Sequence, residues 1–162
     1  MTSKYKLKSF FPLICIPPII FGLINYIYFV LDKTKPTPPL YGLPLILLLS
    51  FTIFWLFFGE FRTKMIKVIL DDEYLLIQNF GGLSKSKKYY YKDLDGFRTS
   101  ILHSKGGDNE YLYFIKGGKK VGKISDFYHK NYLELKAQIS NNLTDLGFAK
   151  FSYLDEIKEI FS

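Results

Sequence analysis

The chain has few of the residues on which most enzymes and secreted domains depend. Its 162 residues include one cysteine, two histidines and one tryptophan. Cys15 has no second cysteine to pair with inside the chain, and no Cys/His spacing typical of a zinc site occurs. We therefore expect no metal and no cofactor. No set of side chains is placed to act together as nucleophile and base, so the sequence favours a protein that is not an enzyme.

Charged residues are scarce in the first third of the chain. Between Phe10 and Phe58 only Asp32, Lys33 and Lys35 carry charge. Two uncharged runs remain, residues 10–31 and 40–58, of 22 and 19 residues. As helices they would be about 33 Å and 28 Å long, which is enough to cross the hydrocarbon core of a bilayer. The sequence therefore predicts two transmembrane helices, joined by an extracytoplasmic loop at residues 32–39.

A buried helical hairpin and a cleaved signal peptide fit these runs less well. A buried hairpin would carry a polar stripe, and neither run has one. A cleaved signal peptide would have a shorter apolar region followed by a small-x-small cleavage site, and no such site follows the first run. Asn25 is the strongly polar side chain of the first run, and we expect it to hydrogen-bond to the second helix or to another copy of the chain.

The distribution of basic residues predicts the orientation. The tail at residues 1–9 carries three lysines, and the loop between the helices carries two. A juxtamembrane basic group follows the second helix, made of Arg62, Lys64 and Lys67. Because Lys and Arg favour the cytoplasmic side, we expect both termini in the cytoplasm, with residues 1–9 as a cytoplasmic basic tail.

The remainder of the chain reads as a strand-rich domain. Short aromatic and β-branched runs alternate with glycine pairs, a pattern typical of an antiparallel meander of about six strands. An apolar stripe then predicts a helix, with members Tyr132, Leu135, Ile139, Leu143 and Leu146. Ser152 and Asp155 have the spacing of a capping box and predict a second short helix. We therefore divide this part into a domain at residues 60–146 and a C-terminal helical extension at residues 147–162.

Lysines gather on two of the predicted hairpins. The candidate basic face comprises Lys85, Lys87, Lys88, Lys92, Lys119 and Lys120. Lysines close to an anionic leaflet are attracted by roughly 1 kcal/mol each, so this face could hold the domain against the membrane. Equally, the lysines could form a solvated surface that keeps the domain soluble. Tyrosines interleave with these lysines, but a domain charge of only +3 argues against nucleic acid as a partner.

The stretches "YLLIQNFGGLSKSKKYYYKDLDGFRTSILHS" and "EYLYFIKGGKKVGKISDFYHKNYLELKAQI" resemble the bacterial pleckstrin-homology-like (PH-like) domains that follow membrane helices. The resemblance covers residues 65–146. It implies an α+β fold, a partly open antiparallel barrel of six to seven strands capped by a C-terminal helix. It also implies no enzymatic activity and a place in the bacterial inner membrane.

Three functions remain open at this point. The first is a membrane-anchored interaction module that binds a protein partner or the anionic inner leaflet. The second is an accessory or assembly subunit of a larger membrane complex, acting through its two helices. The third is a membrane protein of the toxin-immunity type. A homo-oligomer is compatible with each of them.

Overall fold

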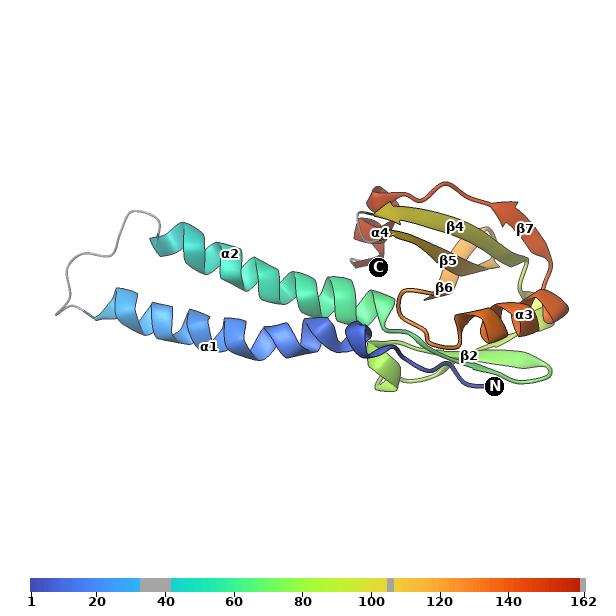
Figure 1. Ribbon diagram of the computed structural model, residues 1–162, viewed down its shortest axis with the longest axis horizontal. Coiled ribbons are helices and arrows are strands. Elements are labelled where there is room, and N and C mark those ends of the chain that lie inside the picture. Colours follow the sequence, from blue (N-terminus) through green and yellow to red (C-terminus); the bar gives the residue numbers. More distant parts are fainter. Residues whose placement is uncertain (33–41, 105–106, 161–162) are drawn as a thin grey trace.

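The computed structural model describes residues 1–32, 42–104 and 107–160. Two long helices lie side by side, and a sheet domain lies at one end of the pair (Figure 1). The helical elements are η1 (Leu7–Phe10), α1 (Phe11–Leu31), α2 (Gly42–Phe54), η2 (Trp55–Arg62), η3 (Phe80–Gly82), η4 (Tyr91–Asp93), α3 (Tyr132–Asn142) and α4 (Tyr153–Ile160). The strands are β1 (Lys67–Leu70), β2 (Tyr74–Gln78), β3 (Lys87–Tyr90), β4 (Gly96–Ser104), β5 (Gly107–Lys116), β6 (Lys119–Ser125) and β7 (Asp145–Phe148).

The helical pair agrees with the two apolar runs. Leu7–Leu31 and Gly42–Arg62 form helices of 25 and 21 residues, long and apolar enough to cross a membrane. None of the most apolar stretch of the first helix is buried within the protein, and only 11% of that of the second. The second helix continues to Arg62 through the π-helical segment η2, four residues beyond the predicted end. Apart from Asp32, the predicted loop 32–39 lies outside the described residues.

The strands form two sheets. One is antiparallel with the order β1-β2-β3, and the other has the order β6-β5-β4-β7. In the second sheet β7 lies parallel to β4, while the other neighbours are antiparallel. The sequence predicts a partly open barrel of six to seven strands, and the described strands form two separate sheets of three and four strands rather than a closed barrel.

The main core fills the space between the two sheets. Leu75 and Ile77 from β2 pack there with Leu112 and Phe114 from β5. Helix α3 covers this core with Tyr132, Leu135 and Ile139, all of them buried. These three residues belong to the predicted apolar stripe, because positions three and four apart share one face of a helix.

The end of the predicted stripe does not belong to the helix. α3 ends at Asn142, and Leu143 is already extended. Residues Asp145–Phe148 instead form β7, which crosses the predicted boundary between residues 146 and 147. A Cβ atom at Gly96 of β4 would lie 2.2 Å from the carbonyl oxygen of Thr144, so the close approach of this segment requires glycine there. The second predicted helix is present as α4, and the amide of Asp155 donates to the Ser152 hydroxyl at 3.3 Å.

Residues 1–9 are built into the domain, although the sequence predicts a plain basic tail. Thr2 forms a bridge with Ile69 of β1, and the Ser3 amide donates to the Val68 carbonyl oxygen at 2.8 Å. Further along, Tyr5 forms a bridge with His129. The tail thus pairs first with the free edge of β1 and then with the segment between β6 and α3.

Side chains fasten the domain to the second long helix as well. The Tyr128 hydroxyl donates to Glu60 of η2 at 2.9 Å. The Phe80 ring lies 5.6 Å from the rings of Phe57 and Phe61, measured between centroids. The domain is therefore held at the end of both helices.

Candidate functional site

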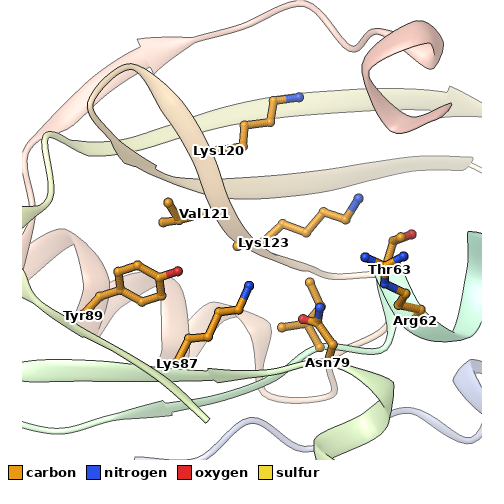
Figure 2. Close-up of a pocket in the computed structure, with 10 residues that line it drawn as sticks. Arg62, Thr63, Asn79, Lys87, Tyr89, Lys120, Val121 and Lys123 are labelled. Carbon is orange, nitrogen blue, oxygen red and sulfur yellow. The ribbon is translucent and has the colours of Figure 1, made fainter. Parts of the chain in front are cut away.

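A cleft lies where the two sheets meet. Strand β3 is the edge of the first sheet and β6 is the edge of the second. The cavity between them has a volume of about 360 Å³. Figure 2 shows that its walls are polar and mostly cationic. We name it the basic cleft, and its polar lining is Arg62, Thr63, Asn79, Lys87, Tyr89, Lys120 and Lys123.

The register of β3 explains why two of these residues face inward. Tyr89 is paired with Leu75, and Lys87 with Ile77. Cross-strand partners lie on the same side of a sheet, and Leu75 and Ile77 are buried in the core. Lys87 and Tyr89 therefore project from the core side of an edge strand, where the sheet ends and the cleft opens (Figure 2). The sequence pattern correctly places both on one face.

A β-bulge in β6 brings the other two lysines together. Gly122 is paired with Phe114 and Lys120 with Ile115, which leaves Val121 without a partner in β5. A bulge of one residue reverses the alternation of side chains. Lys120 and Lys123 consequently share the face of Tyr113, although their spacing in the sequence would put them on opposite faces. The Lys120 ammonium group lies 4.0 Å from the centre of the Tyr113 ring.

The two sheets touch beside the cleft. A Cβ atom at Gly122 would lie 2.3 Å from Cδ1 of Ile77, so no side chain fits at this position. Glycine inside a strand often marks such a close approach. The contact between Gly122 and Ile77 sets the distance between β2 and β6, and with it the width of the cleft.

The fourth cation comes from the helical pair. Arg62 is the last residue of η2 and so stands where the second long helix ends. Its Nη1 atom donates to the carbonyl oxygen of Ile160 at 3.2 Å. The cleft therefore begins at the junction between the helical pair and the domain. Its cations come from η2, β3 and β6.

Helix α4 supplies negative charge beside the cleft. One oxygen of Glu156 accepts from the Lys123 ammonium group at 2.7 Å, and the other accepts from the Tyr113 hydroxyl at 3.2 Å. Lys123 is only 3% exposed, so this ion pair is buried. Asp155 lies 3.9 Å from Lys120. Within the described residues, no carboxylate is paired with Lys87.

Of the predicted basic face, only Lys87 and Lys120 line the cleft. Lys88 lies on the opposite side of β3, with its ammonium group 3.7 Å from the centre of the Tyr74 ring. The other three, Lys85, Lys92 and Lys119, are exposed outside the cleft.

The three residues of the juxtamembrane basic group also have different surroundings. Arg62 enters the cleft, whereas Lys64 forms an ion pair with Glu60 at 2.5 Å. The side chain of Lys67 lies against Gly82. Within α1, the Asn25 amide donates to the Phe21 carbonyl oxygen of its own helix at 2.8 Å. A contact from Asn25 to another copy of the chain stays a prediction.

Several residues of the site are absent from the predicted set, among them Asn79, Tyr89, Lys123 and Glu156. Lys123 belongs to the second lysine cluster and is paired with Tyr113, and the bulge at Val121 brings Lys120 to the same face. Gly122 is the feature of the sequence that could have predicted the bulge, because glycine within a strand indicates a bulge or a close contact. Glu156 lies in the predicted C-terminal extension, and no local pattern places that helix against β6.

Neither histidine takes part in the cleft. His103 is exposed and lies 2.7 Å from Asp108. His129 is buried, and its Nε2 atom lies 2.9 Å from the Ile66 carbonyl oxygen. Burial lowers the pKa of His129 below its usual 6.5. In residues 1–32, 42–104 and 107–160, no three His, Cys, Asp or Glu side chains are grouped so as to hold a metal ion.

Comparisons of the chain with protein-family models, with curated proteins and with solved structures found no match. The resemblance to PH-like domains accordingly stays a prediction.

Proposed function

We propose that this chain is a two-pass membrane protein whose sheet domain is a non-enzymatic binding module. Its ligand is an anion that carries a phosphate group, bound in the basic cleft. The observation that carries the proposal is the convergence of Arg62, Lys87 and Lys120 on one cavity at the end of the second long helix.

The exposed helical pair supports membrane insertion. Large apolar side chains cover its outside, among them Phe21, Leu43 and Leu47, which are 71%, 68% and 61% exposed. Such a surface is unfavourable in water and favourable in lipid. The pairing of residues 1–9 with the domain is a further argument, because it gives the segment before α1 a structural role and speaks against its removal as a signal peptide.

The contacts of the tail also support placing residues 1–9 and the sheet domain on the same side of the membrane. It bonds to β1 before α1 begins, so both ends of the helical pair must lie on one side of any membrane that the pair crosses. The bias of Lys and Arg selects the cytoplasmic side. The basic cleft would then face the headgroups of the inner leaflet.

The chemistry of the cleft suits a phosphate. Lys87 and Lys120 provide ammonium groups, and Arg62 adds the positive charge of its guanidinium group to the same cavity. Tyr89 and Asn79 add neutral donors on the same wall (Figure 2). The volume of about 360 Å³ is at the small end of ligand sites, which fits a headgroup rather than a whole lipid.

The test uses the full chain in lipid nanodiscs. In one arm, inorganic phosphate and glycerol 3-phosphate are titrated into nanodiscs of phosphatidylcholine, and binding is followed by calorimetry. In the other arm, nanodiscs hold phosphatidylcholine and phosphatidylglycerol in equal parts, and native mass spectrometry measures which lipid stays with the protein. Heat of binding in the first arm points to a free phosphate compound, and retained phosphatidylglycerol in the second points to a lipid headgroup.

Charge reversal locates the site. The double variant Lys87→Glu/Lys120→Glu should lose binding in whichever arm shows it. The matched control Lys85→Glu/Lys119→Glu changes the net charge equally but alters exposed lysines outside the cleft, and it should keep binding. Absence of binding in both arms, or equal loss in both double variants, would exclude the cleft as an anion site.

A further inference from the structure

Helix α4 leaves most of its apolar face uncovered. Tyr153 and Leu154 are 67% and 70% exposed, and Ile157 is 40% exposed. At about 100° per residue, these three positions and Ile160 fall within one arc of the helix. Ile160, at the other end of that arc, is only 6% exposed. The helix is therefore amphipathic, and one edge of its apolar face is packed while the rest is open.

Contacts on the other side fix the orientation of α4. Glu156 is held by Lys123 and Tyr113, and the Ile160 carbonyl oxygen accepts from Arg62. A Cβ atom at Gly59 would lie 3.2 Å from Cδ1 of Ile160, so the end of α4 is seated on η2. Because polar and apolar contacts on this side hold the helix, it cannot roll to bury Leu154 and Ile157 without breaking them.

The position of α4 identifies what could cover the open face. The helix lies at the end of the domain that adjoins the helical pair (Figure 1). Its contacts Gly59 and Arg62 are in the last turn of the second membrane-crossing segment, Gly42–Arg62. The open face of α4 is thus continuous with the point where the helical pair would leave the bilayer.

The size of the face favours lipid over protein. Even if each of the three side chains buried the roughly 150–250 Å² of a large aromatic residue, their sum would fall short of the ~800 Å² that each partner buries in a stable protein complex. A bilayer surface needs no matching shape, and an amphipathic helix can lie in it with its apolar face in the acyl boundary. Lys158 is exposed and lies next to Leu154 around the helix axis, where it can reach anionic headgroups.

We infer that α4 is an interfacial helix whose face of Tyr153, Leu154 and Ile157 lies in the bilayer surface beside the second span. This inference rests on the proposed membrane insertion, but it is independent of anion binding in the cleft. It gives the domain a contact with lipid in addition to the two spans, and it sets the depth at which the cleft meets the headgroups.

Spin-label depth measurements test the inference on the full chain in phosphatidylcholine vesicles. Nitroxide labels are attached to Leu154→Cys, Asp72→Cys and Leu47→Cys, each in a Cys15→Ser background. Asp72 lies in the turn between β1 and β2, at the end of the domain remote from the spans (Figure 1), and Leu47 lies within α2. Relaxation by oxygen, which concentrates in lipid, is compared with relaxation by a water-soluble nickel chelate.

We expect the label at Leu154 to be more accessible to oxygen and less accessible to nickel than the label at Asp72. The label at Leu47 should be the most protected from nickel. Equal nickel accessibility at Leu154 and Asp72, with Leu47 protected, would overturn the interfacial helix and leave the spans intact. Nickel accessibility at Leu47 would instead overturn the proposed spans. Protection at Leu154 that disappears when the protein is diluted in lipid would indicate a second copy of the chain, which also overturns the inference.

Discussion

The Ser9 hydroxyl donates a hydrogen bond of 2.8 Å to the carbonyl oxygen of Tyr128, a residue 119 positions further along the chain. Ser9 is completely buried. This bond joins the start of the first long helix to the segment that follows β6. The tail at residues 1–9 is thus part of the folded domain, and its attachment can be tested directly.

Asn131 is the residue with which we test the attachment of the tail. Its side-chain oxygen accepts from the Lys4 amide at 2.8 Å, and its side-chain nitrogen donates to the Thr2 carbonyl oxygen at 3.0 Å. Asn131→Ala removes both hydrogen bonds to the tail and should destabilise the domain by about 1–3 kcal/mol. Hydrogen exchange at the Lys4 amide should accelerate. Asn142→Ala, which removes an exposed bond within α3, should change neither quantity.

Stability should depend on pH through His129. Burial, with a contribution from nearby Lys6, lowers the pKa of this histidine, and the carbonyl oxygens of Ile66 and Ser125 oppose the shift only in part. The unfolded chain, with its histidine pKa near 6.5, therefore binds more protons than the folded one when the pH falls below that value. Stability from this group is complete above about pH 6.5 and declines as the pH falls toward the lower pKa of the folded state.

Thermal unfolding in detergent across the range of about pH 5 to 8, where histidine titrates, measures this dependence. His129→Gln should flatten the profile, at the cost of a lower melting temperature throughout. An unchanged slope in His129→Gln would contradict the assignment.

Substitutions at Gly122 and Ile77 should have non-additive effects on the free energy of unfolding. Gly122→Ala introduces a Cβ atom 2.3 Å from Cδ1 of Ile77, and this overpacking should cost about 1–3 kcal/mol of folding free energy. Ile77→Val removes that Cδ1 atom and alone should cost about 0.5–1.5 kcal/mol.

In the double variant the overlap is relieved, so its loss of stability should be smaller than the sum of the two single losses. Denaturant unfolding of the four proteins measures the difference. Gly22→Ala is a suitable control, because nothing lies within 4 Å of the added atom. Additive losses in the double variant would show that the sheets do not meet at this contact.

The buried ion pair between Lys123 and Glu156 should behave differently from an exposed one. Glu156→Gln removes one member of this buried ion pair, and such a change typically costs about 3–5 kcal/mol. Adding Lys123→Met removes the buried charge and should recover most of that loss. Lys136→Met breaks a more exposed pair with Glu110 and should cost less than about 1 kcal/mol. Hydrogen exchange in α4 will show whether the loss of stability comes from local detachment of this helix or from global unfolding.

The sequence is informative where periodicity is simple. The two long helices follow from uninterrupted apolar runs, and the inward direction of Lys87 and Tyr89 follows from alternation along β3. The position of Ser152 and Asp155 at the start of α4 follows from their spacing. In each case neighbouring residues alone determine the local geometry.

Contacts between distant segments could not be predicted in this way. The bulge at Val121 depends on the partner strand, and it alone puts Lys120 and Lys123 on one face. Leu146 continues the spacing of the α3 stripe, yet it lies in β7 because β4 offers an unpaired edge. The tail does carry a signal: Ser3 and Tyr5 alternate with lysines as in a strand. Its partner β1 lies more than sixty positions away, beyond both long helices.

The attachment of the tail has a mechanical consequence. A domain on a single linker can rotate about it, whereas this domain contacts the helical pair at two points, before α1 and within η2. Rotation about either point alone is therefore blocked. A movement that opened the cleft would displace Arg62 while the tail kept its hold on the start of α1. Such a movement would therefore require the two long helices to tilt relative to each other.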